Sequence, residues 1–249
     1  MRTLYSAAIG ALAFLAVFET VLPAHAAQLS ATVTTDNHYG LYSGQADGSG
    51  LSFVGRNEEG NGHIPDLLPP TPSEACSGTF NWQCPESWAF EVNSEDHVYV
   101  VAWDTGLQQS WIGEFQLPDS SLLLSNTSDW EYAIASGSNP LDGAIPSLLD
   151  IATEIANATW STPQASAPQG TSPWGTIPGI SASAQFVWHD TLDSTSTSDA
   201  NYVIFRSKAP VFSAPTPPPV GVLEPATTVG LGLLGMACLF TKRKGSPNS

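Results

Sequence analysis

The sequence predicts an all-β protein, a β-sandwich that carries one short helix. Several segments alternate apolar and polar residues with a period of two, the pattern of a strand with one buried face. Clusters of Gly, Asp, Asn and Ser separate these segments. Only one segment in the body of the chain has apolar residues at helical spacing. Together these observations favour two sheets packed face to face.

The first expected strand includes Leu29, Ala31 and Val33, which alternate with polar residues. The segment 97–103 is β-branched and aromatic, as is typical of a central strand buried on both faces. The other expected strands lie at 38–42, 51–54, 87–92, 110–117, 130–135, 185–188 and 202–205. Turns are expected at 36–37, 45–50, 93–96 and 104–106, where Asp, Asn and Gly tolerate tight backbone conformations.

One helix is expected, ending near Ala158. Pro146 precedes it, Ser147 can cap it, and Asp150 stands three residues after the cap, as in a capping box. The apolar positions at helical spacing are Leu148, Leu149, Ile151, Ala152, Ile155 and Ala156.

The segment 56–85 is long and irregular, and a loop of that length is usually functional or pinned covalently. Its Cys76 and Cys84 predict a small disulfide loop in an oxidising compartment. A two-ligand metal site is the weaker alternative, because no histidine pair or second cysteine pair nearby completes a tetrahedron. A Pro/Ser/Gly-rich loop at 161–178 and a polar hairpin at 194–200 are also expected.

The N-terminal segment has the layout of a secretory signal peptide over 1–26. Arg2 supplies the basic start and 4–18 the apolar core. Ala24 and Ala26 form the small-residue cleavage site, with cleavage expected after Ala26. The sequence therefore predicts export.

The β-sandwich domain is expected over 27–213, followed by a Pro-rich linker at 214–223. The segment 224–249 combines an apolar transmembrane helix at 226–241 with a basic stop at 242–244. At about 1.5 Å per residue this helix spans about 24 Å, short of the roughly 30 Å hydrocarbon core. A transient sorting signal therefore fits this segment better than a permanent anchor.

The body is strongly acidic. The whole chain has 7 Lys and Arg against 23 Asp and Glu, a net charge of −16. Four of the basic and two of the acidic residues lie in the two targeting segments, so the body keeps three basic and 21 acidic residues, a net charge near −18. Such a surface repels nucleic acid and anionic lipid headgroups, which excludes nucleic-acid binding.

Two candidate catalytic patterns have simpler structural explanations. Asp104-Thr105-Gly106 follows an apolar strand, as the catalytic aspartates of aspartic proteases do. Those enzymes need two catalytic aspartates, and the chain has no second Asp-Thr/Ser-Gly. A hairpin turn explains these residues without chemistry. The histidines lack metal-binding spacing, and no Gly-x-Ser-x-Gly elbow is present. The histidines concerned are His38, His63, His97 and His189.

A third candidate is a sugar or calcium site on the loops. Side-chain oxygens on loops suit Ca²⁺, the one candidate ion, although 45–50 fails the EF-hand pattern. Trp82, Trp160 and Trp174 lie in expected loops and are predicted to be exposed, where indole faces can stack on sugars. The other aromatic residues are expected in the core. The candidate ligand or calcium residues are Asp36, Asn37, Asp47, Asp104, Trp82 and Trp174.

The C-terminal segment resembles the PEP-CTERM sorting signal of Gram-negative bacteria that secrete exopolysaccharide. The resemblance lies in Glu224-Pro225, the apolar run that follows, and Lys242, Arg243 and Lys244. The family pattern is Val-Pro-Glu-Pro, and Leu223 stands at its first proline. The resemblance implies processing by an exosortase, a membrane-embedded cysteine protease-transpeptidase.

The body resembles the galactose-binding-like jelly-roll domains found in many such exported proteins. The similar segments are 31–42, 82–92, 97–106, 111–115, 186–190 and 202–206. The resemblance implies a jelly-roll-like sandwich whose loops at one end often bind carbohydrate.

The expected function is that of an exported, non-catalytic surface or extracellular-matrix protein that associates with extracellular polysaccharide. It would contact the membrane only through its C-terminal segment before processing. Two alternatives stay open: a secreted hydrolase that pairs Asp104 with another acid, and a purely structural matrix protein.

Overall fold

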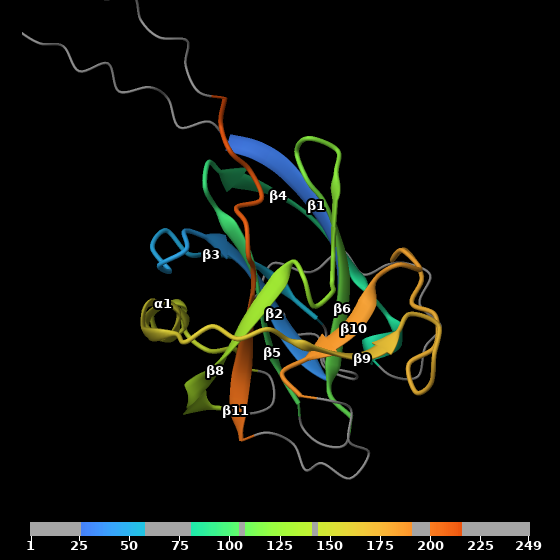
Figure 1. Cartoon of the computed structure of the whole chain (residues 1–249). Helices are drawn as coiled ribbons and strands as arrows, with labels where there is room; N and C mark the ends of the chain where they lie inside the picture. The colour runs from blue at the N-terminus through green and yellow to red at the C-terminus, as the bar shows by residue number, and fades with distance from the viewer. Residues whose placement is uncertain (1–25, 58–80, 105–107, 141–143, 191–199, 216–249) are drawn as a thin grey trace, which may run out of the picture. The chain divides into compact units, whose positions relative to one another are not determined.

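Two antiparallel sheets of six and five strands pack face to face as a sandwich that carries one short helix (Figure 1). This arrangement confirms the predicted all-β sandwich. The computed structural model describes residues 26–57, 81–104, 108–140, 144–190 and 200–215. The predicted signal peptide up to residue 25, most of the linker and the sorting segment lie outside the described residues. Within the described part, no helix is long and apolar enough to cross a membrane.

The six-stranded sheet, sheet A, follows the order β4-β1-β6-β10-β9, and β7 also pairs with β6. Its strands are β1 (Ala26–Asp36), β4 (Glu86–Asn93), β6 (Ser110–Gln116), β7 (Leu122–Leu124), β9 (Gln164–Pro168) and β10 (Gln185–Trp188). The five-stranded sheet, sheet B, follows the order β3-β2-β5-β11-β8. Its strands are β2 (His38–Gly44), β3 (Ser52–Arg56), β5 (His97–Trp103), β8 (Trp130–Ser138) and β11 (Asn201–Ser207). A single 3₁₀ turn, η1 (Asn81–Gln83), precedes β4.

Three clusters of buried apolar side chains hold the layers together. The largest draws on both sheets and fills the space between them, and in it the Trp111 ring contacts the rings of Trp130 and Phe205. A second lies on the outer face of sheet B beneath the helix. A third lies on the outer face of sheet A and takes Trp174 from the loop after β9. Both sheets are therefore apolar on both faces where these segments cover them.

Strand β5 is buried along its whole length, as its sequence predicts. Val98, Val100 and Ala102 belong to the cluster between the sheets. Tyr99 and Val101 point to the opposite face and belong to the cluster beneath the helix. The alternation of strand side chains thus explains why this segment carries apolar residues at every position.

The helix, α1 (Leu148–Asn157), confirms the predicted capping signals. Its N-cap is Ser147, whose Oγ accepts a hydrogen bond from the Asp150 amide at 3.1 Å and donates one to the Asp150 carboxylate at 2.7 Å. Ile151 and Ile155 form its buried face against sheet B. Leu149, which the sequence places among the apolar face, is 76% exposed.

Two short strands were not expected from the sequence. Strand β9 lies inside the predicted loop at 161–178, and β7 lies between the expected strands at 110–117 and 130–135. Strand β9 has no branched or aromatic residue, and its pairing with β10 holds it in the sheet. The predicted hairpin at 194–200 lies almost wholly outside the described residues. Cys76 also lies outside them, so its pairing with Cys84 stays a prediction.

Candidate functional site

Two of the predicted site residues, Asp36 and Asp104, are brought to the same end of the sandwich by the crossover from sheet A to sheet B. Strand β1 ends at Asp36, opposite Ser110 of β6. Strand β2 begins two residues later at His38, opposite Trp103 of β5, and the His38 and Trp103 rings stack at 5.5 Å. Asp104 follows directly. This register places two carboxyl groups from distant parts of the sequence near each other.

Asp36 is held by hydrogen bonds from two neighbours. The Trp174 indole Nε1 donates to Asp36 Oδ2 at 2.9 Å, and the Asn37 side-chain amide donates to Oδ1 at 2.8 Å. Trp174 in turn stacks on Phe186 of β10, with ring centroids 4.6 Å apart. Asn57 donates to the Asn37 carbonyl at 2.6 Å, which ties the crossover to the residue after β3. The crossover is therefore a rigid, polar corner.

The pKa of Asp36 is raised to about 7. Burial is the main cause, because it disfavours the charged carboxylate. The hydrogen bond from Trp174 opposes this shift, whereas the nearby Asp104 carboxylate adds to it. Asp104 is 1% exposed, and its backbone carbonyl accepts a hydrogen bond from Asn139 at 3.0 Å. The corner thus holds a carboxyl group that changes charge near neutral pH beside a buried second one.

Of the other predicted site residues, Trp82 lies close to this corner and Asp47 lies apart from it. Trp82 packs against the same outer cluster of sheet A as Trp174, and its carbonyl accepts a hydrogen bond from Thr34 at 3.0 Å. Asp47 lies in the exposed turn between β2 and β3, where the Ser49 amide donates to its carboxylate at 2.9 Å. Hydrogen bonds from Ser49 lower the pKa of Asp47. Among the described residues, no group of three or more His, Cys, Asp or Glu side chains is placed to hold a metal ion.

The predicted exposure of the loop tryptophans is wrong for Trp174 and only partly right for the others. Trp174 is 4% exposed because its ring packs on Phe186 and its indole N–H bonds Asp36. Trp82 and Trp160 are half-buried. The Arg206 guanidinium lies 3.9 Å above the Trp160 ring and also forms an ion pair with Glu131. The indole faces at these positions therefore serve mainly in packing.

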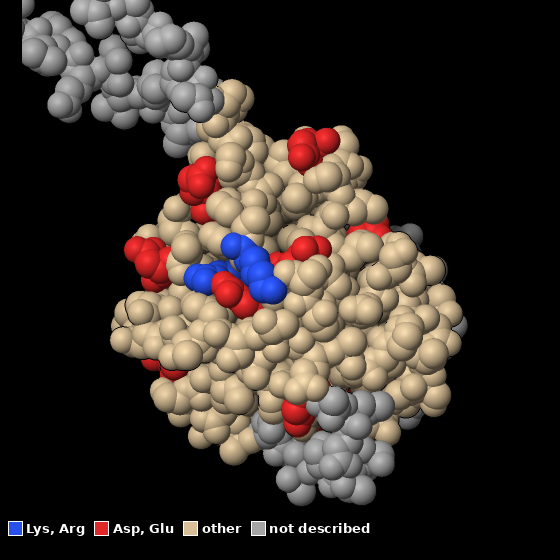
Figure 2. All heavy atoms as spheres, in the orientation of Figure 1, with Lys and Arg blue, Asp and Glu red and all other residues tan. Residues whose placement is uncertain are grey.

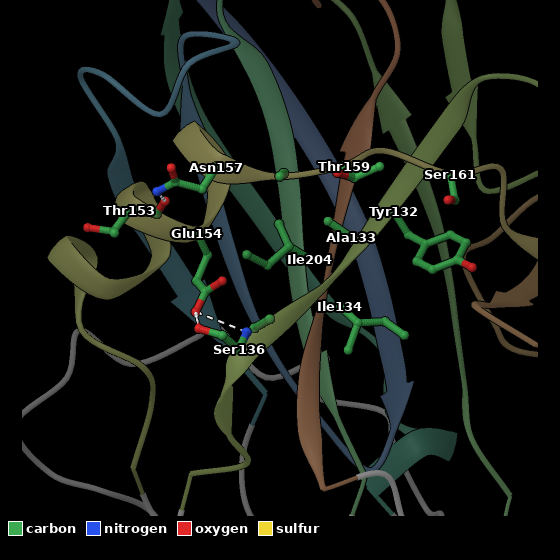
Figure 3. Close-up of a pocket in the computed structure, with 12 residues that line it drawn as sticks. Tyr132, Ala133, Ile134, Ser136, Thr153, Glu154, Asn157, Thr159, Ser161 and Ile204 are labelled. Carbon is green, nitrogen blue, oxygen red and sulfur yellow. Dashed lines mark hydrogen bonds between the residues drawn. The ribbon is translucent and has the colours of Figure 1, made fainter.

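A groove of about 690 Å³ lies between α1 and the edge strand β8, and we call it the α1–β8 groove. Its floor is apolar and includes Ala133, Ala135 and Ile204. Its walls are polar and include Thr153, Glu154 and Asn157 of α1 on one side and Ser136 of β8 on the other (Figure 3). Tyr132, Ile134, Ala158, Thr159 and Ser161 complete the lining. Its volume falls within the range of about 300–1,000 Å³ usual for ligand pockets.

Hydrogen bonds fix both walls of the groove. Glu154 Oε1 accepts from the Ser136 amide at 3.0 Å, from the Ser136 hydroxyl at 2.5 Å and from the Gly137 amide at 3.3 Å. Beyond the helix, Tyr132 and Ser161 exchange two backbone hydrogen bonds of 2.8 and 2.9 Å. Contacts to β8 thus lie at both ends of the groove. The sequence did not predict this groove, because the groove depends on the distance between α1 and β8 in the folded protein.

Basic side chains are scarce on the described surface. Of the three basic residues in the described part of the chain, Arg56 is buried, which leaves Arg206 and Lys208. On the face in Figure 2 the blue atoms form one small patch bordered by acidic atoms. Arg206 pairs with Glu131, and Lys208 Nζ donates to the Ser128 carbonyl at 2.7 Å. The rest of this face is mostly uncharged, with scattered acidic side chains. An anionic partner would therefore meet few basic groups on this face.

Comparison with known proteins identified no relative of this chain. No family model matches the chain, no curated protein is significantly similar to it, and no solved structure matches it.

Proposed function

We propose that this chain is an exported, non-catalytic protein of the cell surface or extracellular matrix of a Gram-negative bacterium, where its body binds extracellular polysaccharide. The observation that carries the binding half is the α1–β8 groove, a ligand-sized hollow with an apolar floor and hydroxyl, amide and carboxylate groups on its walls. The finer fold proposed for the body is the galactose-binding-like jelly roll that its sequence resembles.

The export and sorting half rests on the two terminal patterns of the sequence. The signal peptide would direct the chain through the inner membrane. An exosortase would then recognise Glu224-Pro225, with the apolar helix and Lys242, Arg243 and Lys244 holding the chain in the membrane until cleavage. Expression of the full chain in an exosortase-bearing bacterium tests this. Intact-mass analysis should find a C-terminus near Glu224, and a variant with Glu224 and Pro225 both changed to Ala should stay in the membrane fraction.

Binding can be tested on the body alone. Every described strand, the helix and all three buried clusters lie between residues 26 and 214, which form one compact unit. A glycan array probed with residues 27–214, with and without Ca²⁺, should show retention on at least one polysaccharide. Absence of retention on all glycans in both conditions would leave the purely structural matrix protein as the better account.

One observation favours a second function, that of a secreted hydrolase. Asp36 and Asp104 lie near each other, and burial raises the Asp36 pKa to about 7, a value suited to a general acid or base. The burial of Asp104 argues against it, because a catalytic carboxyl must reach its substrate. If a hydrolytic activity is found, an Asp104→Asn variant with full activity would remove this candidate.

A further inference from the structure

We infer that the α1–β8 groove is the polysaccharide site and that it takes a neutral, hydroxyl-rich stretch of sugar. This inference rests on the proposed function and adds to it the class of glycan and the side chains that contact it.

The walls of the groove offer groups that match sugar hydroxyls. Glu154 uses Oε1 to hold β8, and its other carboxylate oxygen points into the space between α1 and β8 (Figure 3). Asn157 donates its side-chain N–H to the Thr153 carbonyl at 2.8 Å, which leaves its Oδ1 as an acceptor. The hydroxyls of Thr159 and Ser161 can both donate and accept. These groups suit a ligand that presents many hydroxyls.

The floor supplies the apolar contact that a sugar ring also needs. Ala133 and Ala135 of β8 are small and almost fully buried, so the floor is recessed below the walls. Ile204 of β11 lies beneath them and is fully buried, so the two alanines supply the accessible part of the floor. The C–H face of a sugar ring can pack there while its hydroxyls reach the walls.

The groove is already rigid without a ligand. Glu154 joins α1 to the backbone of β8, and the Tyr132–Ser161 bonds join the following segment to the same strand. A site whose side chains are already ordered loses less conformational entropy on binding.

The same hydrogen bonds argue against a peptide as the ligand. An extended peptide would bind an edge strand through a run of backbone hydrogen bonds. On β8, the outward backbone groups of Tyr132 already bond Ser161, and the amides of Ser136 and Gly137 already bond Glu154. The stretch between them is too short for a ladder.

Charge selects the class of glycan. Glu154 is the one charged side chain in the lining, and the body carries a net charge near −18. A polysaccharide rich in uronate or sulfate would be repelled both locally and by the whole domain. A neutral chain escapes this repulsion, and its hydroxyls donate to the carboxylate.

The test compares two variants, each with one tryptophan introduced at an exposed position of α1. Thr153 and Ala156 are both exposed on α1, but only Thr153 lines the groove. Residues 27–214 carrying Thr153→Trp or Ala156→Trp are titrated with a dextran, a β-1,3-glucan and a galactan as neutral probes and with alginate as the anionic probe. Circular dichroism and thermal melting verify that each variant is folded.

We expect the wild type to bind a neutral probe, Thr153→Trp to bind it at least about tenfold more weakly, and Ala156→Trp to bind it within about twofold of the wild type. Asn157→Ala should weaken binding about fivefold, which corresponds to the loss of one hydrogen bond. It serves as a second variant if Thr153→Trp does not fold. Equal binding by wild type, Thr153→Trp and Asn157→Ala would overturn the groove as the site while leaving polysaccharide binding intact. Binding of alginate alone would overturn the neutral class. Binding of no glycan would overturn the proposed function and this inference together.

Discussion

The indole N–H of Trp174 donates a hydrogen bond of 2.9 Å to the carboxylate of Asp36, although 138 positions separate the two residues in the sequence. This bond fastens the loop after β9 to the corner where the chain passes from sheet A to sheet B. It also explains why Trp174 is buried, since its ring covers Phe186 while its polar edge meets a carboxylate. The stability of this corner should therefore depend on the charge of Asp36.

Replacing Asp36 with Asn should flatten the pH dependence of stability. The pKa of Asp36 is raised from 3.8 to about 7 in the folded protein. Between these values the folded protein holds a proton at Asp36 that the unfolded chain releases. The contribution of Asp36 to the free energy of unfolding therefore falls as pH rises from about 4 to 7 and is constant above that. Asn carries no such charge. At about 1.4 kcal/mol per pKa unit the full shift is worth about 4 kcal/mol. Because Asp36 is only half-buried, we expect Asp36→Asn to lessen the fall by about 1–3 kcal/mol.

Urea unfolding at pH 4.5 and pH 8 measures this difference. His97, whose pKa is lowered by burial, is common to both proteins, so the comparison isolates Asp36. Identical pH dependence in the wild type and the variant would show that Asp36 ionises normally in the fold.

The substitution Trp174→Phe should destabilise the protein more at pH 8 than at pH 5. Phe keeps much of the stacking on Phe186 but cannot donate to Asp36. The bond to the ionised carboxylate is worth about 1.5–3 kcal/mol, and the bond to the protonated form is worth less. Unfolding curves at both pH values provide the measurement. A cost that is the same at both, or that persists unchanged in the Asp36→Asn background, would contradict this account of the corner.

Much of the fold could be predicted because its signals are local. The alternation of β1, the unbroken apolar run of β5 and the Ser147–Asp150 cap each lie within a few residues of sequence. Strand β9 could not be predicted in this way, because Gln-Ala-Ser-Ala-Pro has no strand preference and is held by its partner β10.

The candidate sites depend on contacts that a single segment does not reveal. Asp36 and Asp104 each stood out as turn carboxyls, but their meeting follows from the pairing of His38 with Trp103 across β2 and β5. The burial of Trp174 follows from a distant carboxylate and a distant ring. The α1–β8 groove follows from the packing of a helix against the edge of a sheet.

Gly55 on β3 should tolerate no side chain while Trp88 is present. A Cβ at this position would lie 2.1 Å from two atoms of the Trp88 ring, Cη2 and Cζ3. Gly55→Ala should therefore destabilise the protein by about 3 kcal/mol through overpacking. In a Trp88→Phe background those ring atoms are gone, and the same substitution should cost much less. Thermal or urea unfolding of the four proteins of this cycle tests the coupling, and purely additive costs would contradict the close contact.

Glu154 should protect the edge of β8. Glu154→Ala removes the acceptor for the Ser136 and Gly137 amides and should cost about 1–2 kcal/mol. Glu154→Gln keeps a carbonyl oxygen at the same place and is the matched control. Amide hydrogen exchange at Ser136 and Gly137 should accelerate in the Ala variant and stay slow in the Gln variant. Equal exchange in all three proteins would mean that the strand edge is protected by something else.

The central claim, that the body binds neutral polysaccharide, is tested most directly by native electrophoresis through gels that contain the polysaccharide. With a net charge near −18 the body migrates readily toward the anode, so any binding to an uncharged matrix slows it visibly. We predict that residues 27–214 are retarded in a gel containing a neutral polysaccharide and that Thr153→Trp migrates faster than Ala156→Trp in that gel. Unchanged mobility of the wild type in gels containing dextran, β-1,3-glucan or galactan, relative to a gel without polysaccharide, would contradict the claim.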